Sequence, residues 1–308
     1  MYTQSKNIEQ LSDNLSENTV DGRSLWRDAV HRFSRNKAAM AGLVVLTMII
    51  LIVIFGPYFQ AWNYEQIDWS VMGNAAEKGQ PSIETGHYFG TDDLGRDIYA
   101  RTIYGSQVSL MVGTIGALIA MLIGTLYGAI AGYFGGRLDS TMMRIVDILM
   151  AFPFMIFLII LLVIFSRSLF MIFVGVGAIS WLDMSRIVRG QTLSLKNKTF
   201  VEAAVASGVG PLKIIMRHII PNLLGVVVVY TTLLVPQMIL AESFISFLGL
   251  GVQEPQTSWG ALISEGADTI RYGTLWQLLF PLGFFVATLL SFFFVGDGLR
   301  DALDPKDR

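Results

Sequence analysis

Residues 202–221 read EAAVASGVGPLKIIMRHIIP, a polar-edged segment between two hydrophobic blocks, and the rest of the chain is arranged around it. The spacing predicts two short helices joined by a tight turn. Thr199 is a candidate N-cap for the first helix, and Gly208 and Gly210 suit the left-handed backbone that ends a helix. Pro211 fits the first turn of a second helix, where the missing N–H costs nothing.

The second of these helices is predicted to have one apolar face. Its apolar residues recur every three or four positions, at Leu212, Ile215, Met216 and Ile219. Because a helix pair this short is unstable alone, another surface must cover that face. One interpretation is a helix laid into a groove of a partner protein, and the alternative is an interfacial loop whose apolar residues touch only lipid headgroups.

The composition indicates a polytopic membrane protein. The chain has 308 residues, of which 53% are hydrophobic and only 15% charged, too apolar a balance for an ordinary soluble protein. The net charge of −2 argues against a nucleic-acid partner, and the absence of cysteine rules out disulfides and cysteine-ligated metal sites. We therefore expect an all-α integral membrane protein.

Runs without charged residues predict six transmembrane helices, since a hydrocarbon core needs about 20 apolar residues. The predicted spans are approximately 38–59, 107–132, 145–165, 168–187, 222–243 and 277–298, which together form a transmembrane domain over 38–298. The fourth run is the shortest, because only 15 residues separate Arg167 from Asp183.

The distribution of basic residues predicts the orientation of these spans. Cytoplasmic loops carry an excess of lysine and arginine. With both termini in the cytoplasm, 17 of the 22 basic residues lie inside, and the five outside are Lys78, Arg96, Arg101, Arg167 and Arg271. This orientation places 60–106 as an outer loop and 188–221 as a cytoplasmic loop, on the side where ATP is found.

The two ends of the chain are expected to be cytoplasmic. Residues 1–22 are polar and are predicted to be a flexible tail, and 299–308 are predicted to be a second tail. Residues 23–37 are predicted to be an amphipathic interfacial helix, with basic residues opposite an apolar side made of Leu25, Trp26, Ala29, Val30 and Phe33. The alternative for 23–37 is a simple basic stop before the first span.

Two further patterns concern the outer loop and the second span. Thr91 or Asp92 is expected to cap a helix that carries Arg96, Asp97 and Arg101, and the acids there lack the ligand spacing of a calcium loop. Small residues recur every fourth position at Gly116, Ala120, Gly124, Gly128, Gly132 and Gly136. Such a stripe predicts close helix packing, either against an internal helix or against another subunit.

Pro153, Pro236 and Gln237 are candidate pore or gate residues. The two prolines fall inside the third and fifth predicted spans, where each removes a backbone hydrogen bond and tends to kink the helix. Either kink is as compatible with a static packing bend as with a gate hinge. The acids Asp147, Asp183, Glu242 and Asp297 are predicted at span edges, so no charged pair marks a proton or sodium path.

Several phrases resemble the membrane-spanning subunits of ABC importers. Glu202-Ala203-Ala204, with Gly208 six residues later and Pro221 nineteen later as a terminator, resembles their EAA loop, although His218 stands where that pattern usually has an aliphatic residue. The phrases FGTDDLGRD, FLGLGVQEPQTSWG and GDGLRDALDPKDR, at 89–97, 247–260 and 296–308, are similar to the peptide and nickel branch. From about residue 23 onward the chain resembles the C-type permease subunits of bacterial oligopeptide importers.

The resemblance implies a function in the bacterial cytoplasmic membrane. A second homologous permease would complete the path, two ATP-binding subunits would hold ATP and Mg, and an extracytoplasmic substrate-binding protein would deliver oligopeptides. The residues it assigns to ATPase coupling are Glu202, Ala203, Ala204, Gly208, Leu212, Ile215, Met216 and Pro221.

The residues themselves provide no sign of catalysis or of a bound cofactor. The chain contains no GxxxxGK(S/T) phosphate loop and no nucleophile–base set, so a non-catalytic subunit is expected. Three alternatives stay open: a dipeptide or nickel ABC permease, an ion-coupled secondary transporter, and an integral membrane enzyme. The secondary transporter would be expected to carry ionisable groups near the bilayer midplane.

Overall fold

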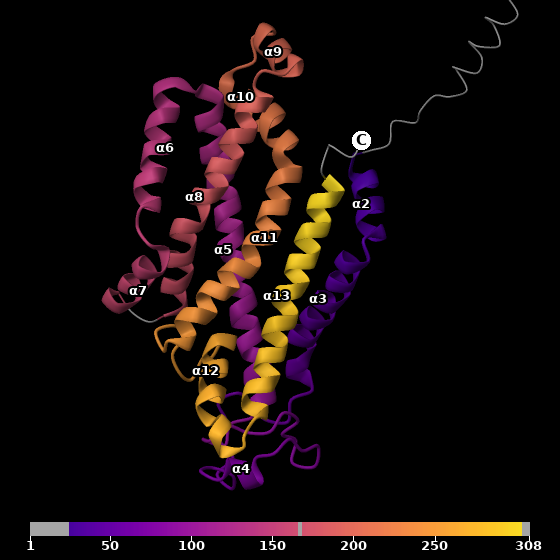
Figure 1. Cartoon of the computed structure of the whole chain (residues 1–308), viewed down its shortest axis with the longest axis vertical. Helices are drawn as coiled ribbons and strands as arrows, with labels where there is room; N and C mark the ends of the chain where they lie inside the picture. Colours follow the sequence, from indigo (N-terminus) through magenta and orange to yellow (C-terminus); the bar gives the residue numbers. More distant parts are fainter. Residues whose placement is uncertain (1–24, 166–167, 304–308) are drawn as a thin grey trace, which may run out of the picture.

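The computed structural model describes residues 25–165 and 168–303, which form a bundle of long helices with several short ones at its ends (Figure 1). In chain order they are α2 (Leu25–Arg35), α3 (Lys37–Phe55), α4 (Ala75–Lys78), α5 (Ile98–Phe134), α6 (Gly136–Met150), α7 (Phe154–Ile164), α8 (Leu169–Leu195), α9 (Thr199–Ala206), α10 (Pro211–Ile214), α11 (Ile220–Phe247), α12 (Trp259–Thr269) and α13 (Trp276–Leu303). The predicted all-α class is confirmed. The predicted tail 1–22 lies outside the described residues, and so do 304–308.

Among the residues that the structure describes, five helices are long and apolar enough to cross a membrane. They are Lys37–Tyr58, Ile98–Phe134, Leu169–Leu195, Pro211–Phe247 and Trp276–Leu303. α6 and α7 provide a sixth span only as a pair, because they are bent by 73° at the break between them. The bundle therefore has five membrane-length helices and one broken pair.

The predicted third span, 145–165, falls on two helices, α6 and α7, rather than on one kinked helix. Pro153 lies in the break rather than inside a helix, with backbone angles outside the helical region, and α7 begins at Phe154. The cause is local, because proline has no N–H to donate and disfavours helical geometry in the residue before it. The kink predicted at Pro153 is a full interruption.

Most of the other helices are longer than predicted. α5 begins at Ile98 inside the expected outer loop, α8 runs on to Leu195, and α13 reaches Leu303 inside the expected tail. The predicted spans stopped at charged residues, but several of those charges are paired within the protein, as Arg189 is with Asp139. A paired charge near a helix end does not stop the helix.

The N-terminus of α5 is capped by Asp97, not by Thr91 or Asp92 as predicted. Asp97 Oδ2 accepts a hydrogen bond of 2.7 Å from the N–H of Ala100. Asp92 instead lies four residues before Arg96, whose Nε is 2.6 Å from Asp92 Oδ2. Asp92 therefore stabilises the loop through Arg96, and Asp97 stabilises the start of α5.

The small-residue stripe of α5 packs against α8. A Cβ added at Gly124 would lie 2.6 Å from the Cβ of Met184, and one at Gly132 would lie 2.8 Å from the carbonyl oxygen of Arg189. The open question of the stripe's neighbour is thus settled in favour of an internal helix. Gly136 is not part of this contact, because it has a φ of 58° in the turn to α6 and nothing lies within 4 Å of its added Cβ.

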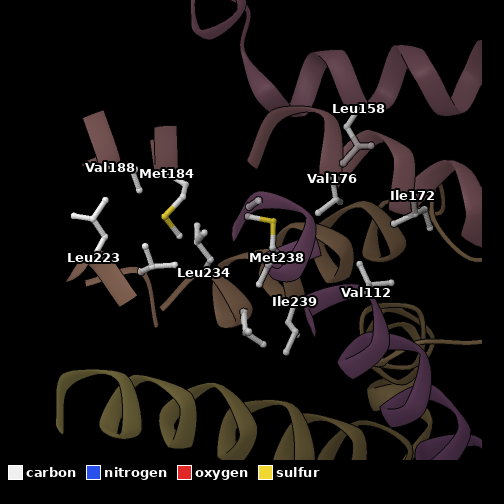
Figure 2. Packing of buried hydrophobic residues seen from close by; sticks show 14 of the residues in the cluster. Val112, Leu158, Ile172, Val176, Met184, Val188, Leu223, Leu234, Met238 and Ile239 are labelled. Carbon is white, nitrogen blue, oxygen red and sulfur yellow. The ribbon is translucent and has the colours of Figure 1, made fainter. Parts of the chain in front are cut away.

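The main apolar core lies where α5, α7, α8 and α11 meet (Figure 2). The side chains labelled there are Val112, Leu158, Ile172, Val176, Met184, Val188, Leu223, Leu234, Met238 and Ile239. On the outside of the bundle, apolar side chains are widely exposed, including Met48 and Ile54 of α3, each 55% exposed. An apolar exterior suits hydrocarbon rather than water.

The two ends of the bundle differ. α9, α10, α2 and the end of α13 lie at one end, and α4 and the loops around it lie at the other (Figure 1). α2 contacts α13, with Ala29 buried and Phe33 half-buried, whereas Val30 is 68% exposed. The side chains of Leu25 and Trp26 lie outside the described residues, so the predicted apolar side of this helix is described only in part.

Candidate functional site

The turn between α9 and α10 is built around Gly208. Gly208 has a φ of 74°, and its N–H donates to the carbonyl oxygen of Val205 over 2.9 Å. The next N–H, of Val209, donates to the carbonyl oxygen of Ala204 over 3.1 Å. These two bonds form a Schellman motif, which closes a helix with a left-handed residue. Gly208 therefore ends α9 as its spacing predicts.

Two details of this predicted turn are wrong. The N-cap of α9 is Lys198, without a side-chain bond, and Thr199 is already the first helical residue. Gly210 has a φ of −64°, an ordinary value for any residue, because the left-handed step is completed at Gly208. Pro211 does occupy the first turn of α10, as predicted.

The predicted single apolar face of the second helix is also wrong. Ile215 and Ile219 are buried in the main core, whereas Leu212 is 69% exposed and Met216 is 52% exposed. The segment Ile215–Ile219 is a π-helix, in which each turn holds more residues than an α-helical turn. Residues spaced for one α-helical face are thereby turned toward different sides.

Pro221 does not terminate the helix. The N–H of Ile220 donates to the carbonyl oxygen of Ile215, five residues back, and α11 continues through Pro221. The wider π turn lets the chain pass a residue that has no N–H to donate and whose ring would crowd the preceding α-helical turn. As a result, Pro211–Phe247 is one continuous helix.

The exposed end of this loop forms what we call the tip surface, made of Glu202, Ala203, Val205, Leu212 and Met216. It lies at the end of the bundle opposite α4 (Figure 1). Exposed apolar side chains beside charged ones suit insertion into a groove of another protein. Of the predicted coupling residues, Ala204 and Ile215 lie beneath this surface and Gly208 shapes its turn.

Charged side chains brace the base of the loop. Arg189 of α8 contacts Asp139 of α6 with both ends of its guanidinium, at 2.5 and 2.6 Å. Lys196 donates from Nζ to the carbonyl oxygen of Gly132 over 3.1 Å, which ties the end of α8 to α5. Sequence reasoning missed these contacts, because residues 50 or more positions apart give no pairing signal in one sequence.

The three candidate gate residues do not form one site. Pro236 is buried inside α11, Gln237 beside it is exposed, and Pro153 lies in the break between α6 and α7. A pocket near the loop end of the bundle is lined mainly by α11, together with Gln191 of α8 and Arg300 of α13, and includes none of the three. Their assignment to a pore or gate stays a prediction.

A buried polar cluster near the opposite end was not predicted. Glu242 is 1% exposed and accepts hydrogen bonds from the hydroxyls of Ser109, at 2.9 Å, and Ser246, at 2.7 Å. Ser109 Oγ in turn accepts from the N–H of Trp259 over 3.2 Å. The cluster thus joins α5, α11 and α12. Its carboxylate is visible in the sequence, but its partners are not.

An ion network lies next to this cluster. Arg101, fully buried, donates from Nη2 to Glu265 over 2.9 Å, and Arg96 donates from Nη1 to Glu254 over 2.9 Å. Burial raises the pKa of Glu265. The positive charges of Arg101 and Arg96 act in the opposite direction and lower this pKa. Two arginines predicted to lie in an outer loop therefore fasten the start of α5 to the segment before α12 and to α12 itself.

Membrane-length helices with an apolar exterior define an integral membrane protein, and this one carries an exposed helical tip at one end. Residues 124–308 match the family model described as binding-protein-dependent transport system inner membrane component. Residues 24–76 match the N-terminal TM domain of oligopeptide transport permease C. The chain belongs to the family of binding-protein-dependent inner-membrane permeases.

Relatives from several bacteria match along nearly the whole chain. The chain is 55% identical to the oligopeptide transport system permease protein OppC of Escherichia coli over 308 residues, covering 100% of both. It is 54% identical to OppC of Haemophilus influenzae over 301 residues, covering 98% of this chain and 95% of the relative. It is 44% identical to the dipeptide transport system permease protein DppC of Bacillus subtilis, covering 92% of this chain and 87% of the relative.

Proposed function

We propose that this chain is the transmembrane permease subunit of an ATP-driven importer that takes up oligopeptides. The observation that carries the proposal is the identity of 55% to an oligopeptide permease over the full length of both chains. Within Bacillus subtilis the oligopeptide and dipeptide permeases match at 45% and 44%. The chain would line the path together with a second homologous permease and receive peptide from an extracytoplasmic binding protein.

In this proposal the tip surface is the contact for the ATPase subunits. Leu212 and Met216 would enter a groove on the partner, and Glu202 would lie at its rim. The buried side chains of Ile214, Ile215 and Ile219 root the same segment in the core, so a displacement of the tip must also displace the bundle. A coupling element needs both a surface that binds a partner and a firm attachment to what it moves.

The proposed orientation places the tip and both termini in the cytoplasm. The segments that hold 17 of the 22 basic residues are those predicted to lie on the cytoplasmic side. ATP and Mg would be bound by the partner ATPases, and this chain would act without catalysis of its own. The extracytoplasmic binding protein would meet the opposite end, where α4 lies (Figure 1).

Uptake by proteoliposomes tests the proposal. The full complex, purified through this subunit, is reconstituted with its binding protein and offered labelled peptides of about two to five residues, with and without internal ATP. ATP-dependent uptake that includes the longer peptides is the expected result. Uptake of dipeptides or of nickel alone would reassign the chain to a sister branch, and uptake without ATP would favour an ion-coupled transporter.

A further inference from the structure

His87 lies buried between two carboxylates in the outer part of the molecule. Its side chain is 2% exposed, and its ring stacks on Trp62 with centroids 4.6 Å apart. Nδ1 lies 2.9 Å from Asp97 Oδ1, and Nε2 lies 3.4 Å from Asp68 Oδ2. Both ring nitrogens therefore face a carboxylate oxygen.

Each carboxylate is held in place by bonds to its other oxygen. Asp97 Oδ2 caps α5 through the N–H of Ala100, while Asp68 Oδ1 accepts from the N–H and the hydroxyl of Ser70 at 2.9 and 2.7 Å. The bond from Ser70 lowers the pKa of Asp68, whereas burial raises the pKa of Asp97. One oxygen of each acid is left for the imidazole.

A neutral imidazole can satisfy only one of these carboxylates. It carries one N–H donor, and its other nitrogen presents a lone pair that a carboxylate oxygen repels. An imidazolium has two donors and can bind both acids with charge-assisted hydrogen bonds. Asp92 is a further charged group close to this site; its charge acts on Asp97, and it is itself paired with Arg96 and Arg101.

We propose that His87 is a pH-sensitive clasp that fastens the segment 62–72 to the start of α5 while its ring is charged. The bond to Asp97 is the shorter and the more deeply buried, so Asp68, which is 18% exposed and can be hydrated, is the partner released when the ring loses a proton. This fastening is independent of which solute the protein transports.

The sign of the pH dependence follows from that chemistry. The clasp contributes its full stabilisation while the imidazolium bridges both acids, and it loses the Asp68 bond when a higher pH removes the proton from the ring. The segment 62–72 then keeps its other contacts. They include the bond of 2.8 Å from the N–H of Asp68 to the carbonyl oxygen of Gly95, the bond from Trp62 Nε1 to the carbonyl oxygen of Thr85, and the stacking of Tyr64 on Tyr104. The segment should therefore open more often in alkaline medium.

Amide hydrogen exchange on the full complex in lipid nanodiscs tests the clasp. Measured from about pH 5.5 to about pH 8.5 and corrected for intrinsic exchange, protection of 62–72 should fall about tenfold, the size expected for one charge-assisted hydrogen bond. Protection of α3, which contains no acidic residue and no histidine, serves as an internal reference and should not change. The matched control is His31→Gln, an exposed histidine in α2, which should behave as wild type.

Two variants at the clasp make the result decisive. His87→Gln should remove the pH dependence, and Asp68→Asn, which leaves the contact of His87 with Asp97 in place, should give the alkaline level of protection at every pH. The Asp68 variant also guards against a His87 variant that fails to fold. Wild-type protection that does not change with pH, or an unchanged pH response in Asp68→Asn, would overturn the proposal.

Discussion

Gly208 carries the turn of the tip in a conformation that other residues avoid. Its φ is 74°, yet no atom lies within 4 Å of the place where a Cβ would stand. A side chain there would meet open space but would strain the backbone by about 1–2 kcal/mol. Strain without a steric clash should alter the shape of the tip and leave the bundle intact.

We expect Gly208→Val to uncouple ATP hydrolysis from peptide uptake while the protein still inserts at normal levels. The reconstituted complex would be assayed for both activities in the same vesicles. The matched control is Gly210→Val, since Gly210 has a φ of −64° and is equally open. Normal uptake by the Gly208 variant, at normal protein level, would remove this residue from the coupling mechanism.

For single residues in the tip, the sequence predicted the main turn residues correctly but not which side chains are buried. Gly208 and Pro211 follow from local backbone rules, which need no tertiary information. Whether Leu212 or Ile215 is exposed depends on the π turn over 215–219. The residue types in that stretch do not predict a π turn. Glu242 was visible as an acid near the end of a span, but its serine partners come from α5 as well as from α11.

Among the helices, α5 packs closely against α8 along the predicted small-residue stripe. We expect Gly124→Val to lower the thermal stability of the detergent-solubilised protein by about 1–3 kcal/mol, because the added atoms would press on the backbone oxygen of Trp181, 2.8 Å from the Cβ position. Gly190→Val, in α8 with nothing within 4 Å, is the control. Equal melting of the two variants would contradict close packing at the seam.

The ends of helices were predicted correctly where a charged residue follows the apolar run. They were predicted wrongly where the charge is paired or where a proline interrupts the run. α5 begins before Arg101 and α8 continues beyond Arg189, although the predicted spans excluded both residues. Each arginine is paired with an acid inside the protein. The break at Pro153 was predicted only as a kink, since a proline in an apolar run reads alike whether the helix bends or stops. Its extent depends on how α7 packs against α8.

For the whole molecule, the absence of cysteine offers a direct test of orientation. Any cysteine introduced into the chain is the only one it has. We expect Glu84→Cys to react with a membrane-impermeant maleimide in intact spheroplasts, and Ser207→Cys to react only after the membrane is opened. Both residues are exposed, Glu84 in the loop between α4 and α5 and Ser207 at the end of α9, and α4 and α9 lie at opposite ends of the bundle. The reverse pattern would invert the proposed topology.

The continuity of the helix from Pro211 to Phe247 has a mechanical consequence. Its 37 residues, at about 1.5 Å each, make a shaft about 55 Å long with the tip at one end and Glu242 near the other. If it pivots in the core, a tilt of about 5° carries one end about 5 Å relative to the other. If the tip is the ATPase contact as proposed, a small displacement there would move the opposite end of this helix by a distance comparable to the size of an amino-acid residue.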